Sequence, residues 1–400
     1  MKKIFYLIVI CLFMISSCSN IQLDSKDDII IEAEDKKIIA TWITYQEIKE
    51  FVNNSNNEKE FEINIHEMVS TLKKYNINVV FLHVRAFDDC FYKSKIYPVS
   101  TYCANQEGNL KFDVLQNFID ICKPLGIEVH AWINPYRIRN DNDTGKIPEN
   151  TLAYGYLNDG YNDRLIVTDN NIYYNPAYVE VQKYILNGIR EILDNYSVDG
   201  IHIDDYFYPT TSENIDKEIY NSYKEIGGNL KLDDYRRRNI NSLVTSIYAL
   251  VKSFNEDLCF SISPSGDIDK NYNNHYADVI KWLTEDGYAD YIIPQIYYGY
   301  ENEDIPFANT LFKWMSINNS KLIIGLGIYK SGKTDSYAKS GKQEWLNNSD
   351  IISRQISDVI NNNLKGFSIY SSSFLTKNTD NSVLETEKEN IMKIMEIYES

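Results

Sequence analysis

The sequence predicts a single (β/α)8 TIM barrel over residues 37–400, preceded by a short leader segment. The first observation behind this fold is that short apolar, strand-like runs alternate with longer segments of helical period along the whole region. The second is that eight such alternations occur, and the third is that no linker or internal repeat divides them. Repeated β-α units of this number are typical of a barrel with parallel strands.

The predicted strands and helices follow each other in order along the chain. We expect strands at residues 38–45, 78–87, 127–136, 199–208, 259–265, 290–298, 321–330 and 366–374. We expect helices near residues 64–76, 112–125, 177–196, 233–254, 275–286, 306–317, 350–363 and 383–398. Residues 138–175 are rich in Asn, Asp, Gly and Tyr, and we expect them to form an extended loop after strand 3, over one face of the barrel.

An open doubly wound sheet is the alternative fold. Such a sheet normally has a Gly-rich phosphate-binding turn after an early strand, and the sequence has none. Gly325 and Gly327 lie inside the seventh predicted strand, which indicates close packing or room for a ligand. The barrel is therefore favoured, and no cofactor is expected.

The N-terminal residues have the pattern of a secretory signal. A Met-Lys-Lys start is followed by an apolar run over residues 4–15, which is short for a membrane span. The run leads into Ile-Ser-Ser before Cys18, which resembles the lipobox of bacterial lipoproteins. Residues 1–17 are then a signal peptide, and residues 18–36 are a lipidated cysteine followed by a solvated tether. This predicts a protein anchored through Cys18 to the outer face of a bacterial membrane, whereas an ordinary signal peptide with an incidental cysteine is the alternative.

Composition narrows the class of partner. The formal net charge of −17 disfavours nucleic acids and anionic membrane surfaces, because like charges repel. The chain has 32 Tyr, 16 Phe and 5 Trp, and many of the tyrosines fall where strands are expected to end. Aromatic rings that stack on sugar faces explain this placement, although core packing also accounts for many of them.

The cysteines and histidines do not predict a metal site. Cys122 and Cys259 lie in apolar periodic segments and are expected to be core thiols. Cys90 and Cys103 flank a loop, and they either form a disulfide or remain thiols. The histidines lie on different strands and lack the spacing of a zinc motif, so no metal is expected.

Residues 199–209 are the most informative segment of the chain. Because side chains alternate along a strand, Ile201 and Ile203 share one face, and His202, Asp204 and Tyr206 share the other. Adjacent carboxylates at a buried strand end repel each other, which indicates a raised pKa that suits acid catalysis.

We therefore assign Asp204 as a catalytic acid, with Asp205 supporting it. In the alternative interpretation, one of the two carboxylates caps a loop and the other is solvated. Asp89, in the loop after strand 2, is a second candidate acid or a partner of Arg85 or Arg137.

The same alternation brings polar side chains to the inner face of the other strands. They are Trp42, Thr44, His83, Arg85, His130, Trp132, Asn134, Ser261, Ser263, Ser265, Gln295, Tyr297, Ser368 and Tyr370. A barrel interior is normally filled by branched apolar side chains, so this set indicates a substrate site at the C-terminal strand ends. For His83, His130 and His202, a role as hydrogen-bonded core residues is the alternative.

Several motifs occur in the order found in a known family. They are Val84-Arg85 with Asp89-Cys90-Phe91-Tyr92, residues 131–137, Tyr174-Asn175-Pro176, residues 199–209, Ser261-Ile262-Ser263-Pro264, residues 290–297 and residues 325–330. Together they resemble the glycosyl hydrolase-like 10 family of bacterial extracytoplasmic lipoproteins. The resemblance implies a TIM barrel with glycoside hydrolase activity on the peptidoglycan glycan backbone or a related amino-sugar polymer. The motif on strand 4 is also similar to that of chitinase-type barrels.

The sequence departs from such patterns at three places. Family members often have Gly at the position of Asp88 and Trp at the position of Val99. Many barrel glycosidases have a nucleophilic Glu at the end of strand 7, and residues 327–330 contain no carboxylate. The usual pair of carboxylates of a retaining enzyme is therefore not evident.

The resulting hypothesis is a lipid-anchored glycosidase in which Asp204 protonates the leaving oxygen. Asp89 or Asp205 acts as base, or the acetamido group of the substrate takes that role, oriented by Tyr297 or Gln295. The expected substrate-binding residues are Trp42, Arg85, Tyr92, Trp132, Asn134, Tyr136, Arg137, His202, Tyr206, Tyr208, Gln295, Tyr297, Tyr298 and Tyr370. A non-catalytic glycan-binding lipoprotein and a deacetylase acting on the same polymers are the alternatives.

Overall fold

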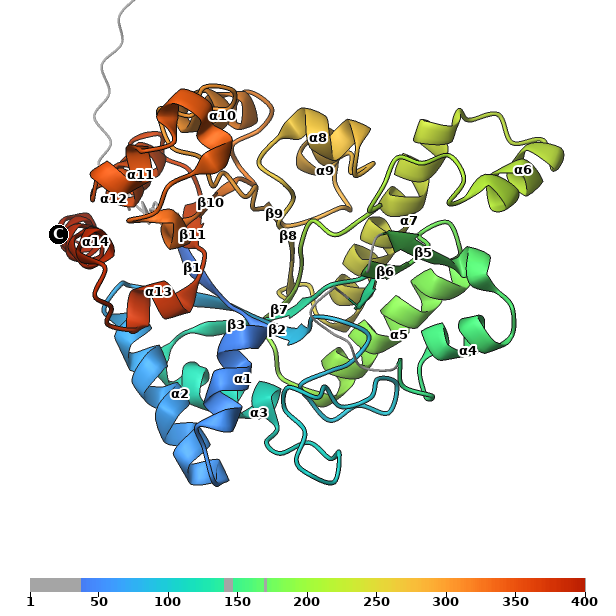
Figure 1. Cartoon of the computed structure of the whole chain (residues 1–400), viewed down its shortest axis with the longest axis horizontal. Coiled ribbons are helices and arrows are strands. Elements are labelled where there is room, and N and C mark those ends of the chain that lie inside the picture. The colour runs from blue at the N-terminus through green and yellow to red at the C-terminus, as the bar shows by residue number, and fades with distance from the viewer. Residues whose placement is uncertain (1–36, 140–146, 169–170, 400) are drawn as a thin grey trace, which may run out of the picture. The chain divides into compact units, whose positions relative to one another are not determined.

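The computed structural model describes residues 37–139, 147–168 and 171–399 (Figure 1). The expected signal peptide, Cys18 and the tether lie outside these residues. Within the described segments, no helix is both long enough and apolar enough to cross a membrane.

Eight parallel strands form the barrel. They are β1 (Ile38–Ile43), β2 (Val79–Arg85), β3 (Glu128–Ile133), β7 (Gly200–Ile203), β8 (Cys259–Ile262), β9 (Tyr291–Ile292), β10 (Ile323–Leu326) and β11 (Gly366–Ile369). Their order is β10-β11-β1-β2-β3-β7-β8-β9, and single bridges from Ile292 to Leu322 and from Gln295 to Gly325 bring the two edge strands together. The predicted TIM barrel is confirmed, and each expected strand is present in a shorter form.

Helices surround the strands (Figure 1). The helices expected from the sequence are α2 (Glu58–Lys73), α3 (Val114–Cys122), α5 (Val179–Asn195), α7 (Leu232–Phe254), α9 (Val279–Thr284), α10 (Phe307–Met315), α12 (Ile351–Asn361) and α14 (Ser382–Glu399). Further helices are α1 (Tyr45–Asn53), α4 (Leu152–Asn158), α6 (Lys217–Glu225), α8 (Ile268–Asn273), α11 (Glu344–Asn347) and α13 (Ser372–Thr376). Helix α5 shows the packing rule, because its buried Val181, Ile185, Ile189 and Ile192 recur at helical spacing on one face.

Helix α1 begins directly after β1 because its first turn is capped. The Thr44 hydroxyl accepts a hydrogen bond from the Glu47 backbone N–H at 3.4 Å, and the Glu47 carboxylate accepts one from the Thr44 N–H at 2.6 Å. The chain therefore turns from strand to helix at Thr44, and Thr44, Tyr45 and Gln46 stay at the end of the barrel.

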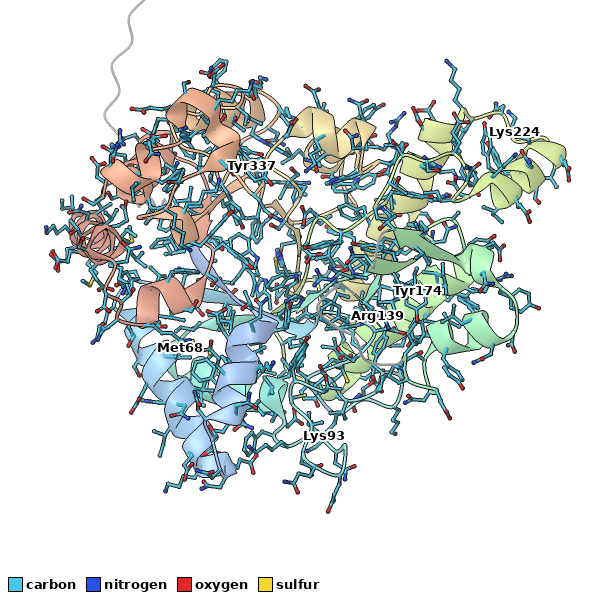
Figure 2. All side chains as sticks on the ribbon, viewed as in Figure 1. Met68, Lys93, Arg139, Tyr174, Lys224 and Tyr337 are labelled. Carbon is cyan, nitrogen blue, oxygen red and sulfur yellow. The ribbon has the colours of Figure 1, made fainter. Side chains whose placement is uncertain are left out.

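The segment after β3 is more ordered than the extended loop that the sequence predicts. Strands β4 (Arg137–Arg139), β5 (Leu165–Thr168) and β6 (Asn171–Tyr174) form an antiparallel sheet in the order β4-β6-β5, and Figure 2 labels Arg139 and Tyr174 on it. The Tyr174 hydroxyl donates to Asp88 at 2.5 Å, which ties this sheet to the loop after β2. Strand β4 starts at Arg137 and so fixes the position of that guanidinium.

The two faces of the barrel strands are divided as the alternation rule predicts, except at Arg85. The pairing of β2 with β3 shifts register between His83 and Arg85, and the Arg85 guanidinium packs on the Tyr97 ring of the large core and not on the inner face. Ile201 and Ile203 belong to the large core between the strands and the helices. A smaller apolar cluster contains Trp42, Phe81 and Trp132, and the Phe81 ring stacks on His202 with a centroid distance of 4.1 Å. The inside of the barrel thus combines aromatic and polar side chains with a few aliphatic ones, which are Ala40, Val79, Ile293 and Ile323.

Candidate active site

A cleft of about 430 Å³ lies at the C-terminal ends of the barrel strands. Its lining comes from all eight barrel strands or the residues that directly follow them. It consists of Trp42, Thr44, Tyr45, Gln46, His83, Trp132, Arg137, Asp204, Asp205, Tyr206, Ser263, Gln295, Tyr297, Tyr329 and Tyr370. In TIM barrels this end of the sheet carries the active site.

Asp204 is the buried carboxyl group of the cleft, with 3% of its surface exposed. Its Oδ2 accepts hydrogen bonds from Trp132 Nε1 at 3.0 Å and from Asn134 Nδ2 at 3.4 Å. Its Oδ1 accepts no hydrogen bond from the described residues. Because both donors point to Oδ2, a proton on this carboxyl group belongs on Oδ1.

The environment of Asp204 favours its protonated form near neutral pH. Burial is the main cause and the negative charge of Asp205 the second, and together they raise the pKa of Asp204 from 3.8 to about 7. The Arg137 charge and the Trp132 hydrogen bond act in the opposite direction. A carboxyl group with this pKa can hold a proton at neutral pH and release it to a reacting group.

Arg137 and Tyr206 form one wall of the cleft. The Arg137 guanidinium lies over the Tyr206 ring, 4.3 Å from its centroid, and over the Phe87 ring at 4.6 Å. Its Nε donates to the Ala86 carbonyl oxygen at 3.2 Å. These contacts hold a positive charge beside Asp204 and leave 39% of Tyr206 exposed.

Trp42 is held in the cleft by a chain of hydrogen bonds through the barrel interior. Trp42 Nε1 donates to His202 Nε2 at 3.1 Å, and His202 Nδ1 lies 2.8 Å from Ser261 Oγ. Since the indole N–H can only donate, His202 Nε2 accepts, and the proton of the neutral ring belongs on Nδ1. Burial lowers the pKa of His202 well below 6.5, so the ring is uncharged. His202 therefore positions Trp42 from below the cleft.

His83 and Ser263 place unsatisfied polar atoms at the cleft. The His83 ring stacks on Trp132 with a centroid distance of 3.6 Å, and the side chain is buried. Neither of its ring nitrogens has a hydrogen-bond partner among the described residues, and the same holds for Ser263 Oγ. Buried polar groups normally have partners, so these atoms indicate that a ligand supplies them.

Comparison with known proteins places the chain in a family. The family model for glycosyl hydrolase-like 10 matches residues 37–345. This chain belongs to the glycosyl hydrolase-like 10 family. The resemblance stated from the sequence motifs is therefore confirmed.

Two relatives that are named as glycosyl hydrolases resemble the chain over different lengths. Glycosyl hydrolase YngK of Bacillus subtilis is 33% identical over 253 residues, which are 58% of this chain and 48% of YngK, so the chain spans about half of that relative. Glycosyl hydrolase DigH of Escherichia coli K12 is 29% identical over 331 residues, which are 75% of this chain and 73% of DigH.

Two solved structures share the fold at low sequence identity. The PgaB glycoside hydrolase domain from Bordetella bronchiseptica has a TM-score of 0.59 at 12% identity, and the match covers 90% of this chain and 98% of that domain. The catalytic domain of β-amylase from Paenibacillus polymyxa has a TM-score of 0.57 at 11% identity, with the same coverage of 90% and 98%. Both support the TIM-barrel fold.

The cleft of this glycosyl hydrolase-like 10 protein contains only part of the residue set expected from the sequence. Those that line it are Asp204, Asp205, Trp42, Trp132, Arg137, Tyr206, Gln295, Tyr297 and Tyr370. Those that do not are Asp89, Arg85, Tyr92, Asn134, Tyr136, His202, Tyr208 and Tyr298. The second group lies behind the cleft or beside it.

Arg85 supports the loops around the cleft from within the core. Its guanidinium donates to the backbone oxygens of Asn134 at 2.8 Å and Pro135 at 3.3 Å, and it lies 3.5 Å from the Asp88 carboxylate. Asn134 in turn bonds both Asp204 and the Arg137 backbone N–H. Both residues therefore position the groups that line the cleft.

Asp89 lies next to two thiols instead of at the cleft. After burial, the charge of Asp89 is the largest contribution that raises the pKa of the Cys103 thiol. Cys90 and Cys103 are buried free thiols in the structure, so the disulfide that the sequence left open is not formed. Within the described residues, no group of three or more His, Cys, Asp or Glu side chains is arranged to hold a metal ion.

The remaining aromatic residues of the second group are mostly core residues. Tyr92, Tyr136 and Tyr208 are fully buried, and Tyr208 accepts a hydrogen bond from Asn239 Nδ2 at 3.3 Å. In the sequence, an aromatic residue at a strand end looks the same whether its side chain lines a cleft or is buried in the core.

Six residues that line the cleft are not among the catalytic and substrate-binding residues expected from the sequence. They are Thr44, Tyr45, Gln46, His83, Ser263 and Tyr329. Alternation placed Thr44, His83 and Ser263 on the inner face. It does not predict how close each of them lies to the cleft at the C-terminal end of the barrel. The capping pattern Thr-x-x-Glu at residues 44–47 was the available signal that the chain turns at the cleft.

Proposed function

We propose that this chain is a glycoside hydrolase that cleaves glycosidic bonds in an amino-sugar glycan, with the glycan backbone of peptidoglycan as its substrate. The observation that carries the proposal is Asp204, a buried carboxyl group with a pKa of about 7 in an aromatic-lined cleft at the C-terminal end of a barrel. Membership of a glycosyl hydrolase-like family supports it, as do the names of YngK and DigH.

Asp204 is the proposed general acid. The glycosidic C–O bond breaks as the proton on Oδ1 passes to the leaving oxygen, and the bonding electron pair stays with that oxygen. The carboxylate that remains is stabilised at Oδ2 by the Trp132 and Asn134 donors and by the nearby charge of Arg137. A water molecule then adds its hydroxyl group to the sugar carbon. The proton that the water releases replaces the one that Asp204 donated.

The second catalytic role falls to Asp205 or to the acetamido group of the substrate. Asp205 shares the cleft with Asp204, whereas Asp89 does not line it. Gln295 Nε2 already donates to the Ser263 carbonyl at 3.0 Å, which fixes the amide close to the centre of the cleft. Gln295 and Tyr297 are the groups proposed to orient an acetamido group.

The cleft suits sugar rings because its walls are aromatic. Trp42, Trp132, Tyr206, Tyr297 and Tyr370 supply ring faces, and Arg137 and His83 supply polar contacts. Concave sites with a few fixed polar groups and perturbed carboxyl groups are typical of enzyme active sites.

We also propose that a lipid on Cys18 anchors the protein at the outer face of a bacterial membrane, in the cell envelope. The basis is the sequence pattern before Cys18. Labelling of cells with a palmitate analogue tests this, because Cys18→Ala should abolish incorporation into the protein.

Mass spectrometry of reaction products tests the catalytic proposal. The purified protein is incubated with intact peptidoglycan, with glycan strands freed of peptides, and with chitin-type oligomers. Glycosidase activity yields shorter chains that have gained water, and Asp204→Asn abolishes them without loss of the fold. Release of acetate alone would identify a deacetylase, and binding without any product would identify a non-catalytic glycan-binding protein.

A further inference from the structure

A second cavity lies beside the cleft, on the loops that follow β7 and β8. It has a volume of about 610 Å³, and we call it the side cavity. Its lining is polar apart from Pro209 and consists of Thr210, Thr211, Asp267, Asp269, Lys270, Asn273, Asn274 and His275. Both loops leave the C-terminal ends of their strands, as do the residues of the cleft, and Asp269, Lys270 and Asn273 of the lining belong to α8.

Asp205, Tyr298 and His275 lie where the cleft and the side cavity meet. Asp205 lines the cleft, and its negative charge acts on the His275 ring, which lines the side cavity. Gly266 packs between the two spaces, because a Cβ built on it would lie 2.5 Å from the Gln295 carbonyl oxygen and 2.9 Å from the Tyr298 ring. Gln295 lines the cleft, and Asp267, the residue after Gly266, lines the side cavity. The two spaces are therefore neighbours that share a border of polar side chains.

Thr210 and Asp267 accept backbone hydrogen bonds, but several other polar groups of the side cavity are not used by the described part of the protein. Lys270 has no ion-pair partner in the described part of the chain, and the side chains of Thr211, Asn273 and Asn274 form no hydrogen bonds there. His275 Nδ1 is buried, also without a partner among these residues. Donors and acceptors are thus available on several sides of one cavity.

The loop on the β7 side is held in a fixed position. Arg236 donates to the backbone oxygens of Thr211 at 3.2 Å and Ser212 at 2.6 Å, and it forms a fully buried ion pair with Asp216 at 2.6 Å. A bidentate, buried pair of this kind fixes geometry. Thr211 is therefore presented on a preorganised loop, which lowers the cost of binding a ligand.

We propose that the side cavity is a subsite that binds a further sugar unit of the same glycan chain, adjacent to the unit held in the cleft. This inference rests on the proposed function. Sugar edges carry hydroxyl and acetamido groups, which can form hydrogen bonds with the amide, hydroxyl, ammonium and carboxylate groups of this cavity. Its volume falls within the range of about 300–1,000 Å³ that is common for ligand sites. The enzyme then distinguishes longer from shorter glycan chains through contacts near Asp205.

Calorimetric binding with glycan fragments of two lengths tests the subsite. The full chain carrying Asp204→Asn, which prevents turnover, is titrated with a disaccharide and with a hexasaccharide of alternating N-acetylglucosamine and N-acetylmuramic acid. Adding Lys270→Ala and Asn274→Ala should weaken hexasaccharide binding about tenfold, because two polar contacts are lost. Disaccharide binding, which uses only the cleft, should change less than about twofold.

A matched control removes the same two residue types elsewhere. Asn221→Ala with Lys224→Ala lies on the exposed face of α6, outside both cavities, and Figure 2 labels Lys224 at that distant end. It should leave both affinities unchanged. Hexasaccharide affinity that is unaffected by the Lys270 and Asn274 substitutions, an equal loss for both lengths, or no binding of the hexasaccharide would overturn the subsite.

Product analysis of the wild-type chain separates this inference from the proposed function. Shorter chains from the wild type together with length-independent binding would leave the glycosidase proposal standing and reject the subsite. Length-dependent binding through Lys270 and Asn274 without any product would reject the glycosidase proposal and retain the subsite.

Discussion

Asp204→Asn should stabilise the protein at high pH while it removes the catalytic acid. The folded-state pKa of about 7 lies above the ordinary value of 3.8, so the folded state binds this proton more tightly than the unfolded state does. The buried carboxylate therefore costs stability above pH 3.8. The cost grows as the pH rises toward 7 and is constant beyond it. Asparagine has nearly the same shape and no charge, so the variant avoids this cost at every pH.

The expected magnitude follows from the size of the pKa shift. A pKa shift of about three units lowers the free energy of unfolding of the wild type by about 4 kcal/mol at pH 8. The same relation gives a loss of about 2 kcal/mol at pH 5 and almost none at pH 3. The amide nitrogen that replaces Oδ1 in Asp204→Asn lacks an acceptor among the described residues. This missing hydrogen bond reduces the stabilisation of the variant by about 1–3 kcal/mol at every pH. The difference between pH 8 and pH 5, about 2–3 kcal/mol, is independent of that reduction.

Urea unfolding of the wild type and the variant measures this difference. Unfolding is followed by tryptophan fluorescence at several pH values, and the free energy of unfolding is compared between the two proteins at each pH. Asp380→Asn, at an exposed position on the surface, is the control and should show no pH-dependent difference. A gap between wild type and Asp204→Asn that stays constant from pH 5 to pH 8 would refute the raised pKa.

Three further substitutions test the electrostatics and packing of the cleft. Trp132→Phe removes the N–H donor to Asp204 Oδ2, so the pKa of Asp204 should rise by about one unit in a carbon-13 NMR titration; an unchanged value would show that this bond does not stabilise the carboxylate. Asp205→Asn removes a neighbouring negative charge, so the same titration should show a fall below 7, and a rise would contradict the assignment. Gly325→Ala places a Cβ 3.2 Å from the Trp42 ring and 2.8 Å from a backbone carbonyl oxygen. The ring then has to move, and kcat/KM on glycan strands should fall about tenfold with a lower Tm, whereas wild-type values for both would show that the packing is not tight.

The sequence predicted the barrel well because periodicity reports directly on burial. The alternation of Ile201, His202 and Ile203 assigned the faces of β7 correctly, and adjacent Asp204 and Asp205 do share the cleft. Gly325 illustrates the same success, because the predicted close packing is found against Trp42. These features can be predicted because they depend on the local sequence pattern and because the C-terminal ends of parallel strands all lie at the same end of a barrel.

The remaining features depend on contacts between segments that are distant in the sequence. The small sheet after β3 has short strands with weak alternation, and its position depends on the bond between Tyr174 and Asp88. Tyr92 and Tyr136 carry the aromatic signature of a binding residue, yet the structure buries them. His83 shows the opposite case, because only the stacking on Trp132 and the unpartnered nitrogens reveal its position at the cleft.

The dependence of the rate on the leaving group shows whether Asp204 donates a proton to the leaving oxygen. The kcat/KM of wild type and of Asp204→Asn is measured on a natural glycan strand and on the same glycan carrying a dinitrophenyl leaving group, which departs without protonation. If Asp204 is the general acid, Asp204→Asn should lose at least about 100-fold on the natural strand and less than about tenfold on the activated substrate. An equal loss on both substrates, or wild-type turnover of the natural strand, would contradict this role.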